Sequence, residues 1–83
     1  MKSYILTVTC QDQNGLIAAL TNCIASNGGN ILNLAQHTAT DLGMFFCRVV
    51  FVGQEGFSEP VFRSEFDKLA AGYSMNWDIF DKS

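Results

Sequence analysis

Two hydrophobic periods alternate along this chain, and their order limits the possible folds more than any single motif does. Apolar residues take every second position in residues 4–10, and residues 44–52 are mostly bulky, aromatic or β-branched, so both segments predict strands. Between them, apolar residues recur every three or four positions in residues 16–27, which predicts an amphipathic helix. The chain therefore combines strands and helices within a short length.

A second strand and a hairpin turn are predicted in the middle of the chain. Gly28-Gly29 is expected to end the first helix, because glycine readily takes the left-handed conformation at a helix terminus. Residues 31–40 alternate in part and predict a strand. Asp41-Leu42-Gly43 then predicts a hairpin turn, so this strand should run antiparallel to the next one.

The last part of the chain repeats the helical and alternating patterns. Ser58 is placed to cap a helix, and Pro60 fits its first turn, where the missing amide donor has no cost. Apolar residues at helical spacing continue to Tyr73, and Gly72 is predicted to close the helix. Alternation in residues 75–79 predicts a final strand.

The order strand, helix, strand, strand, helix, strand predicts the ferredoxin-like βαββαβ plait, an α+β fold. Right-handed crossovers then place two helices on one face of a four-stranded antiparallel sheet, with the first and third strands in the middle. The 83 residues allow a single domain over residues 1–83. The other face of the sheet is left open, and several polar residues fit it: Thr7, Thr9, Arg48, Asn76 and Asp78.

Charge and composition argue against nucleic acid and membrane partners. The net charge is −3 and the five Lys and Arg residues are scattered, so no basic patch for a phosphate backbone is expected. The longest apolar run, residues 44–52, contains Arg48 and is too short to span a membrane. No signal-peptide pattern follows Met1, so we expect a cytoplasmic protein.

The cysteines and the single histidine do not form a recognisable catalytic or metal site. Cys10, Cys23 and Cys47 are an odd set at wide spacing, which gives neither a disulfide framework nor a CxxC pair. Each lies in an apolar pattern, so we interpret all three as core residues. His37 has no nucleophile or carboxylate partner at a recognisable spacing. We therefore expect no catalytic residue, no metal ligand and no cofactor.

Other functions built on this plait lack their signatures in this sequence. A metal carrier needs two thiols in its first loop, and an electron-transfer form needs four cysteines at cluster spacing. An acylphosphatase-like enzyme needs an arginine and a glycine-rich cradle where this chain has an acid and amides in residues 11–15. Residues 43–49 are faintly similar to an RNA-recognition signature, but no basic residue precedes Gly43 and the first strand lacks the matching aromatic residue.

The turn after the first strand offers the chemistry to bind a small zwitterion. Backbone amides at a helix start attract a carboxylate, while Asp12 and loop carbonyls can receive an ammonium group. Gly15 has no β-carbon, so a ligand can approach the backbone there. Ordinary capping of the helix by Asp12 or Asn14 is the alternative, and the spacing leaves both interpretations open.

Two short motifs flank the predicted first helix: Asp12-x-x-Gly15-Leu16-Ile17 and Gly29-Asn30-Ile31-Leu32. They resemble the signature of the ACT domain, a small regulatory module that typically binds amino acids at a subunit interface. Gln36-His37-Thr38 and residues 43–49 are similar more specifically to the N-terminal ACT domain of bacterial formyltetrahydrofolate deformylases. The resemblance covers essentially the whole chain.

The sequence departs from that family pattern at three positions. Asn14 stands where the family commonly has proline, which loosens the turn. Ala35 and Ala39 flank the Gln-His-Thr unit where the family often carries an acid. His37 belongs to this unit and is not the histidine of the family's catalytic set, which lies in a separate C-terminal domain.

The resemblance implies a regulatory role and a set of binding residues. Glycine or methionine is the implied effector, bound by a homo-oligomer that we expect to be a dimer. Hydrolysis of 10-formyltetrahydrofolate to formate and tetrahydrofolate is implied for the C-terminal domain, so these residues are not expected to be catalytic alone. The implied ligand-binding residues are Asp12, Asn14, Gly15, Leu16 and Ile17 of one subunit with Asn30, Ile31 and Leu32 of its partner. The alternative is a module that only dimerises, through its open sheet face or an edge strand.

Overall fold

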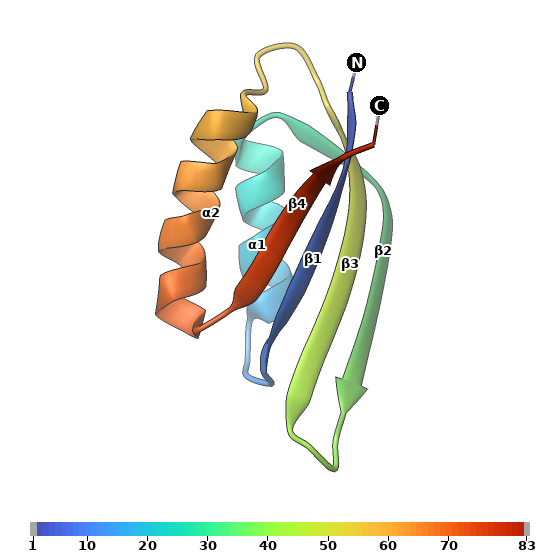
Figure 1. Cartoon of the computed structure of the whole chain (residues 1–83), viewed down its shortest axis with the longest axis vertical. Coiled ribbons are helices and arrows are strands. Elements are labelled where there is room, and N and C mark those ends of the chain that lie inside the picture. Colours follow the sequence, from blue (N-terminus) through green and yellow to red (C-terminus); the bar gives the residue numbers. More distant parts are fainter. Residues whose placement is uncertain (1, 83) are drawn as a thin grey trace.

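A computed structural model describes residues 2–82 and has the predicted order of strands and helices (Figure 1). The strands are β1 (Ser3–Gln11), β2 (Gly29–Ala39), β3 (Met44–Gly53) and β4 (Asn76–Asp81), and the helices are α1 (Leu16–Ser26) and α2 (Glu59–Tyr73). All strand pairs are antiparallel and the sheet order is β2-β3-β1-β4. Both helices cover one face of the sheet, so the predicted plait is confirmed.

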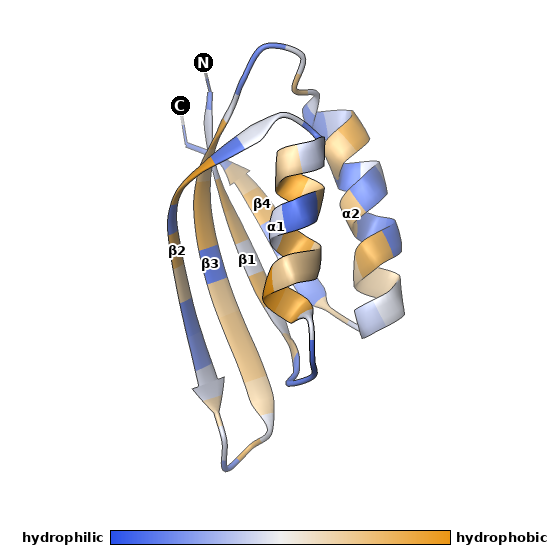
Figure 2. Cartoon of the chain, turned by 180° about the vertical axis from the view of Figure 1, so that it is seen from behind, coloured by the Kyte–Doolittle hydropathy of each residue, from blue (hydrophilic) through white to orange (hydrophobic). Residues whose placement is uncertain are grey.

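The hydrophobic core fills the space between the sheet and the two helices. Alternate residues of the central strands are buried there, and each helix adds one apolar stripe. β3 and α1 are largely hydrophobic, whereas α2 alternates between hydrophobic and hydrophilic residues because one side of it faces solvent (Figure 2). The largest fully buried side chains are Phe51, Phe62, Phe66, Leu6, Leu20, Ile24, Val8 and Val49.

Most element boundaries differ from the prediction by one or two residues, including the last strand, which was predicted over residues 75–79 and is Asn76–Asp81. Two of the differences have a clear physical reason. β2 begins at Gly29 rather than at residue 31, because Gly29 already pairs with Gly53 of β3. Gly72 lies inside α2 and does not close it. The helix continues to Tyr73, and Ser74 takes the left-handed conformation with φ 55° while its N–H donates to the carbonyl of Ala70.

The cysteines only partly match the core interpretation. Cys10 and Cys47 are buried, but Cys23 is half-buried at the surface of α1, and all three thiols are free. Burial raises the pKa of each thiol above its ordinary value of 9.0. None of them therefore has the lowered pKa of a reactive cysteine.

Candidate functional site

The turn between β1 and α1 borders a hollow of about 260 Å³. The hollow lies between this turn, the start of α1 and the hairpin end of β2 and β3. Every residue that the sequence assigns to this part of the site lines it. The full lining is Asp12, Gln13, Asn14, Gly15, Leu16, Ile17, Ala18, Gln36, Thr38 and Phe45.

The first turn of α1 has backbone groups that no side chain caps, and its residues line this hollow. Gly15 is the N-cap residue, no side chain bonds to the exposed amides, and the first turn contains no acidic residue. The predicted alternative, capping by Asp12 or Asn14, is therefore wrong. Helices leave their first N–H groups without an internal acceptor, so the start of α1 can bind a carboxylate.

Gly15 keeps the backbone accessible at this point. Its φ of 83° is in the left-handed region, which explains why a glycine stands here. A β-carbon placed on Gly15 would meet no atom within 4 Å, so the space above it is open. A ligand can approach the helix start from this side.

The turn is held in place from two sides. The N–H of Asp12 donates to the carbonyl of Gly43 over 2.9 Å, which ties the turn to the β2–β3 hairpin. Gln13 Nε2 donates to the carbonyl of Tyr73 over 3.1 Å, which ties it to the end of α2. The carboxylate of Asp12 lies on an exposed residue at the rim of the hollow, where it can receive an ammonium group.

Five lining residues were not assigned from the sequence: Gln13, Ala18, Gln36, Thr38 and Phe45. Gln36 pairs with Cys47 and Thr38 pairs with Phe45, and these β3 residues face the helices. The alternation of Gln36 and Thr38 in the sequence was a usable signal, because it puts both on one face of β2.

The other predicted segment, Asn30-Ile31-Leu32, lies at the opposite end of the sheet. Asn30 pairs with Val52, which also pairs with Ser3 at the start of β1, whereas the hollow lies beyond the end of β1. Leu32 lies at an irregularity of the β2–β3 pairing and is 58% exposed. A single chain therefore does not bring the two predicted halves of the site together.

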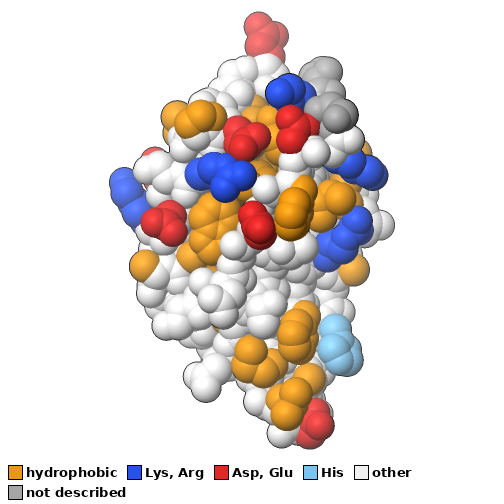
Figure 3. Space-filling model, in the orientation of Figure 1, with side chains coloured by type: hydrophobic (Ala, Val, Ile, Leu, Met, Phe, Trp, Pro, Cys, Tyr) orange, Lys and Arg blue, Asp and Glu red, His pale blue; other side chains and the backbone are white. Residues whose placement is uncertain are grey.

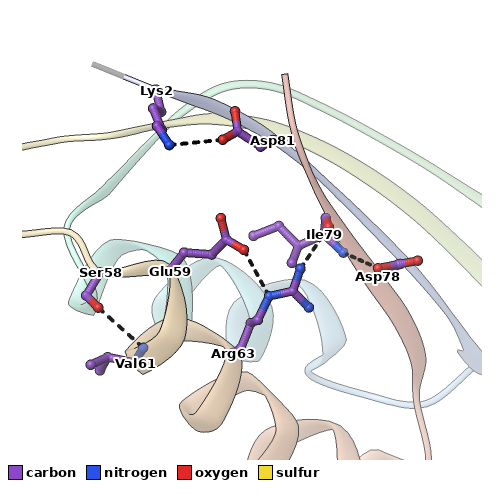
Figure 4. A network of polar contacts seen from close by, with 8 residues as sticks. All are labelled: Lys2, Ser58, Glu59, Val61, Arg63, Asp78, Ile79 and Asp81. Atoms are coloured by element: carbon purple, nitrogen blue, oxygen red, sulfur yellow. Dashed lines mark hydrogen bonds and ion pairs between the residues drawn. The ribbon is translucent and has the colours of Figure 1, made fainter. Parts of the chain in front are cut away.

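The two edge strands of the sheet differ in how their outer backbone groups are occupied. At β4, Arg63 Nη2 donates to the carbonyl of Ile79 over 3.2 Å, and the N–H of Ile79 donates to Asp78 Oδ1 over 2.9 Å (Figure 4). Glu59 holds the guanidinium of Arg63 in place through a 3.0 Å ion pair. β2 has no Lys, Arg, Asp or Glu, and no side chain within residues 2–82 is hydrogen bonded to its backbone.

Exposed charges of both signs are mixed on the surface. Lys and Arg lie among Asp and Glu in the view of Figure 3, mostly in the half of the molecule nearer the chain termini.

His37 is exposed on the open sheet face, where its ring stacks on Phe46 with 6.3 Å between ring centres. Within residues 2–82, no three His, Cys, Asp or Glu side chains gather as a metal site would require. Neither helix in that range has the length and apolar character needed to cross a membrane.

Comparison with known proteins supports the resemblance seen in the sequence. The model of the family described as ACT domain matches residues 4–56. A formyltetrahydrofolate deformylase of Synechocystis sp. is 35% identical over 75 residues, covering 89% of this chain and 26% of that protein. One of Corynebacterium sp. is 30% identical over 83 residues, covering 95% of this chain and 28% of that protein.

The solved structures agree with the sequence relatives. The crystal structure of formyltetrahydrofolate deformylase from Burkholderia mallei superposes with a TM-score of 0.92 at 25% identity, covering 98% of this chain and 28% of that one. This chain therefore spans about a quarter of the length of the relatives it matches. It is homologous to the regulatory ACT part of those enzymes, and it belongs to the ACT domain family.

Proposed function

We propose that this chain binds a small amino acid, glycine or methionine, between two copies of itself and regulates a formyltetrahydrofolate deformylase activity. That activity would be carried by a C-terminal domain outside these residues, in keeping with the names and lengths of the relatives. We place the protein in the cytoplasm, where free thiols such as those of this chain persist. The proposal rests on one observation, the hollow beside the uncapped start of α1.

The two charges of an amino acid match the two sides of the hollow. The ligand carboxylate would accept hydrogen bonds from the first N–H groups of α1, and Asp12 would receive the ammonium group. Gly15 leaves the approach open. Leu16, Ile17 and Phe45 supply an apolar wall that can contact a side chain such as that of methionine.

The second half of the site would come from a partner subunit through β2. The midpoint of β2 (Gly29–Ala39) is Leu34, so antiparallel pairing of two β2 strands about Leu34 would place Asn30 of the partner subunit opposite Thr38. Leu32 of the partner subunit would then lie opposite Gln36. Because Gln36 and Thr38 line the hollow, this pairing would bring the two predicted segments together, with Asn30 holding the interface.

The different occupation of the two edges supports β2 as the pairing strand. An exposed edge strand offers unpaired backbone groups to a second chain, and charged side chains usually discourage such pairing. β2 carries no such charge, whereas Arg63 and Asp78 occupy the backbone groups of Ile79 at the edge of β4.

Substitution of Gly15 tests the binding site. Glycine or methionine at millimolar concentration should release or absorb measurable heat with the wild-type chain, and Gly15→Val should abolish that heat, because the valine side chain would fill the approach. Titration calorimetry measures this, with circular dichroism to show that the variant is folded. A wild-type chain that gives no heat with either amino acid, or a Gly15→Val variant with unchanged affinity, would contradict the site.

The matched control for this experiment is Gly56→Val. Gly56 has a similar left-handed φ of 91°, and a β-carbon there also meets nothing within 4 Å, but it does not line the hollow. The two variants should therefore lose similar stability, on the order of 1–2 kcal/mol for a left-handed side chain. Only Gly15→Val should lose the ligand.

Substitution of Leu32 tests the partner's contribution. Leu32→Lys places a charge at the edge of β2, so dimerisation and amino-acid binding should both fall by about tenfold or more. Light scattering and calorimetry measure the two effects. Val61→Lys is the control, because Val61 is 53% exposed on α2, away from this edge. A dimer that forms but does not respond to amino acids would favour the alternative of a module that only dimerises.

A further inference from the structure

The face of the sheet that turns away from the helices carries side chains that the proposed function does not use. Phe46 and Phe80 are 38% and 50% exposed there, and Arg48 and Asp78 are exposed charges. A hollow of about 300 Å³ lies on this face over β1, β3 and β2. Its lining includes Thr7, Thr9, Ala35, His37, Phe46 and Arg48.

The charged pair lies symmetrically about β1. Thr7 of β1 pairs with Arg48 of β3 on one side and with Asp78 of β4 on the other. Arg48 and Asp78 are thus two strands apart, roughly 10 Å between backbones, which is too far for a direct ion pair within one chain. Neither forms an ion pair with any residue in the part of the chain that the structure describes.

The neighbouring row along the strands is apolar and has the same symmetry. Ile5 of β1 pairs with Val50 of β3 on one side and with Phe80 of β4 on the other. All three belong to the open face, because the residues that alternate with them, such as Leu6 and Ile79, are buried against the helices. The face therefore combines a charged row and an apolar row, both centred on β1.

We propose that this face binds the same face of a second copy about a twofold axis that lies between the two sheets and runs along β1. Such an axis exchanges the two sides of β1, so Arg48 of each copy lies opposite Asp78 of the partner subunit. Val50 lies opposite Phe80 of the partner subunit, and the two Ile5 side chains meet on the axis. Face-to-face sheets with nearly aligned strands are a common packing of β-sheets.

The charges select this axis over the other simple choice. A twofold axis that runs across the strands through the charged row would place Arg48 on Arg48 and Asp78 on Asp78, and like charges in contact oppose association. With the axis along β1 both contacts are attractive and self-complementary, as a closed dimer requires. Asp78 Oδ1 already accepts the N–H of Ile79, and its second oxygen is available to the partner's guanidinium.

The hollow of about 300 Å³ on the open face is consistent with the same face-to-face packing. It lies over the β3 side of β1, and in the proposed packing this side faces β4 of the second copy. Asn76 and Asp78 of the partner subunit would enter it opposite Phe46 and Arg48, because Thr9 pairs with both Phe46 and Asn76. This interface is separate from the β2 edge, because none of the residues that it pairs lies in β2.

A charge exchange tests the proposal on the 83-residue chain. Sedimentation velocity over a concentration series should show association that Arg48→Asp and Asp78→Arg each weaken at least tenfold, because each variant opposes like charges. The double variant Arg48→Asp with Asp78→Arg should restore association to near the wild-type level. Asp78→Asn, which keeps an oxygen for the N–H of Ile79, should weaken it less than Asp78→Arg.

The matched control exchanges two charges on the solvent side of α2. Lys68→Asp with Asp67→Arg changes the same kinds of charge, and both residues are exposed away from the sheet. This control should leave association unchanged. Association that survives both single variants, a double variant that stays weakened, or a chain that is monomeric at every concentration would overturn the proposal.

The same variants separate this proposal from the β2 dimer. If both interfaces exist, Arg48→Asp should reduce larger assemblies to dimers that still bind an amino acid, whereas Leu32→Lys should leave dimers that do not. If the amino-acid site fails but the face-to-face contact is right, only the charge exchange will affect association.

Discussion

Gly29 shows how closely the elements approach one another at a single residue. A β-carbon at this position would lie 2.6 Å from Ile24 Cγ2 and 3.0 Å from Phe51 Cδ2, so α1, β2 and β3 meet where no side chain fits. Gly29→Ala should lower the free energy of unfolding by about 1–3 kcal/mol, the usual cost of overpacking a core. Urea unfolding measures it, and a variant as stable as the wild type would show that Ile24 can move aside.

At the residue scale, the sequence could predict only the part of the site that is continuous in the chain. Asp12, Gly15 and their neighbours form one short motif, and all of them line the hollow. Gln36 and Thr38 come to the same hollow through the register of β2 against β3, which depends on the hairpin and on the irregularity after Ile31. That register was not available from the pattern alone.

At the element scale, the strands and helices could be predicted because their periods are local, but their ends depend on packing. α2 passes through Gly72 because Ala70 is buried in the core and the N–H of Met75 donates to the Ala70 carbonyl over 2.9 Å. An interior glycine costs a helix only about 1 kcal/mol, so these tertiary contacts outweigh it. The observed start of β2 differs from the predicted one for a similar reason, because Gly29 already pairs with Gly53.

Gly72 should therefore be a position at which the chain can be stabilised. A β-carbon there meets no atom within 4 Å, and the residue is exposed near the end of α2. Gly72→Ala should raise the free energy of unfolding by about 0.5–1 kcal/mol, because alanine loses less backbone entropy in a helix. Thermal or urea unfolding measures the change, and a destabilised variant would argue that Gly72 is not helical in solution.

At the scale of the whole molecule, the topology could be predicted but the difference between the two sheet edges could not. Strand order follows from connection rules that hold for any chain with this pattern of elements. The occupation of the β4 edge depends on Arg63 and Ile79, which are separated by 16 positions and meet only because α2 lies beside β4. A long-range contact of this kind has no local signal in the sequence.

The stability of the whole molecule should fall in alkaline solution. Burial raises the pKa of all three thiols above 9.0, so the folded chain holds these protons more tightly than the unfolded chain does. The stabilisation is complete below the unfolded pKa and is lost as the pH rises above it. Burial also raises the pKa of Tyr4 above 10.0, which adds a loss of the same sign at higher pH.

Urea unfolding at a series of pH values measures this loss. The free energy of unfolding should decline above about pH 9 in the wild type. The Cys47→Ala variant should be less stable at neutral pH, because it leaves a small cavity, but its decline should be shallower since one buried thiol is gone. An identical slope in both proteins would mean that Cys47 is not the source of the effect.

The contact between Arg63 and Ile79 also limits how far this sheet can extend. A chain with two open edges can add one copy at each side, and every added copy presents a fresh edge, so growth has no natural end and produces fibres. With the outer groups of Ile79 occupied, the β4 edge offers a second copy fewer free backbone groups than the β2 edge does, so a sheet extended by the proposed β2 pairing would have the occupied β4 strands at both of its ends. In the proposed β2 pairing, the hydrogen bond from Arg63 would thus oppose further growth of the sheet at the β4 edge, although the β2 edge carries no charge of its own.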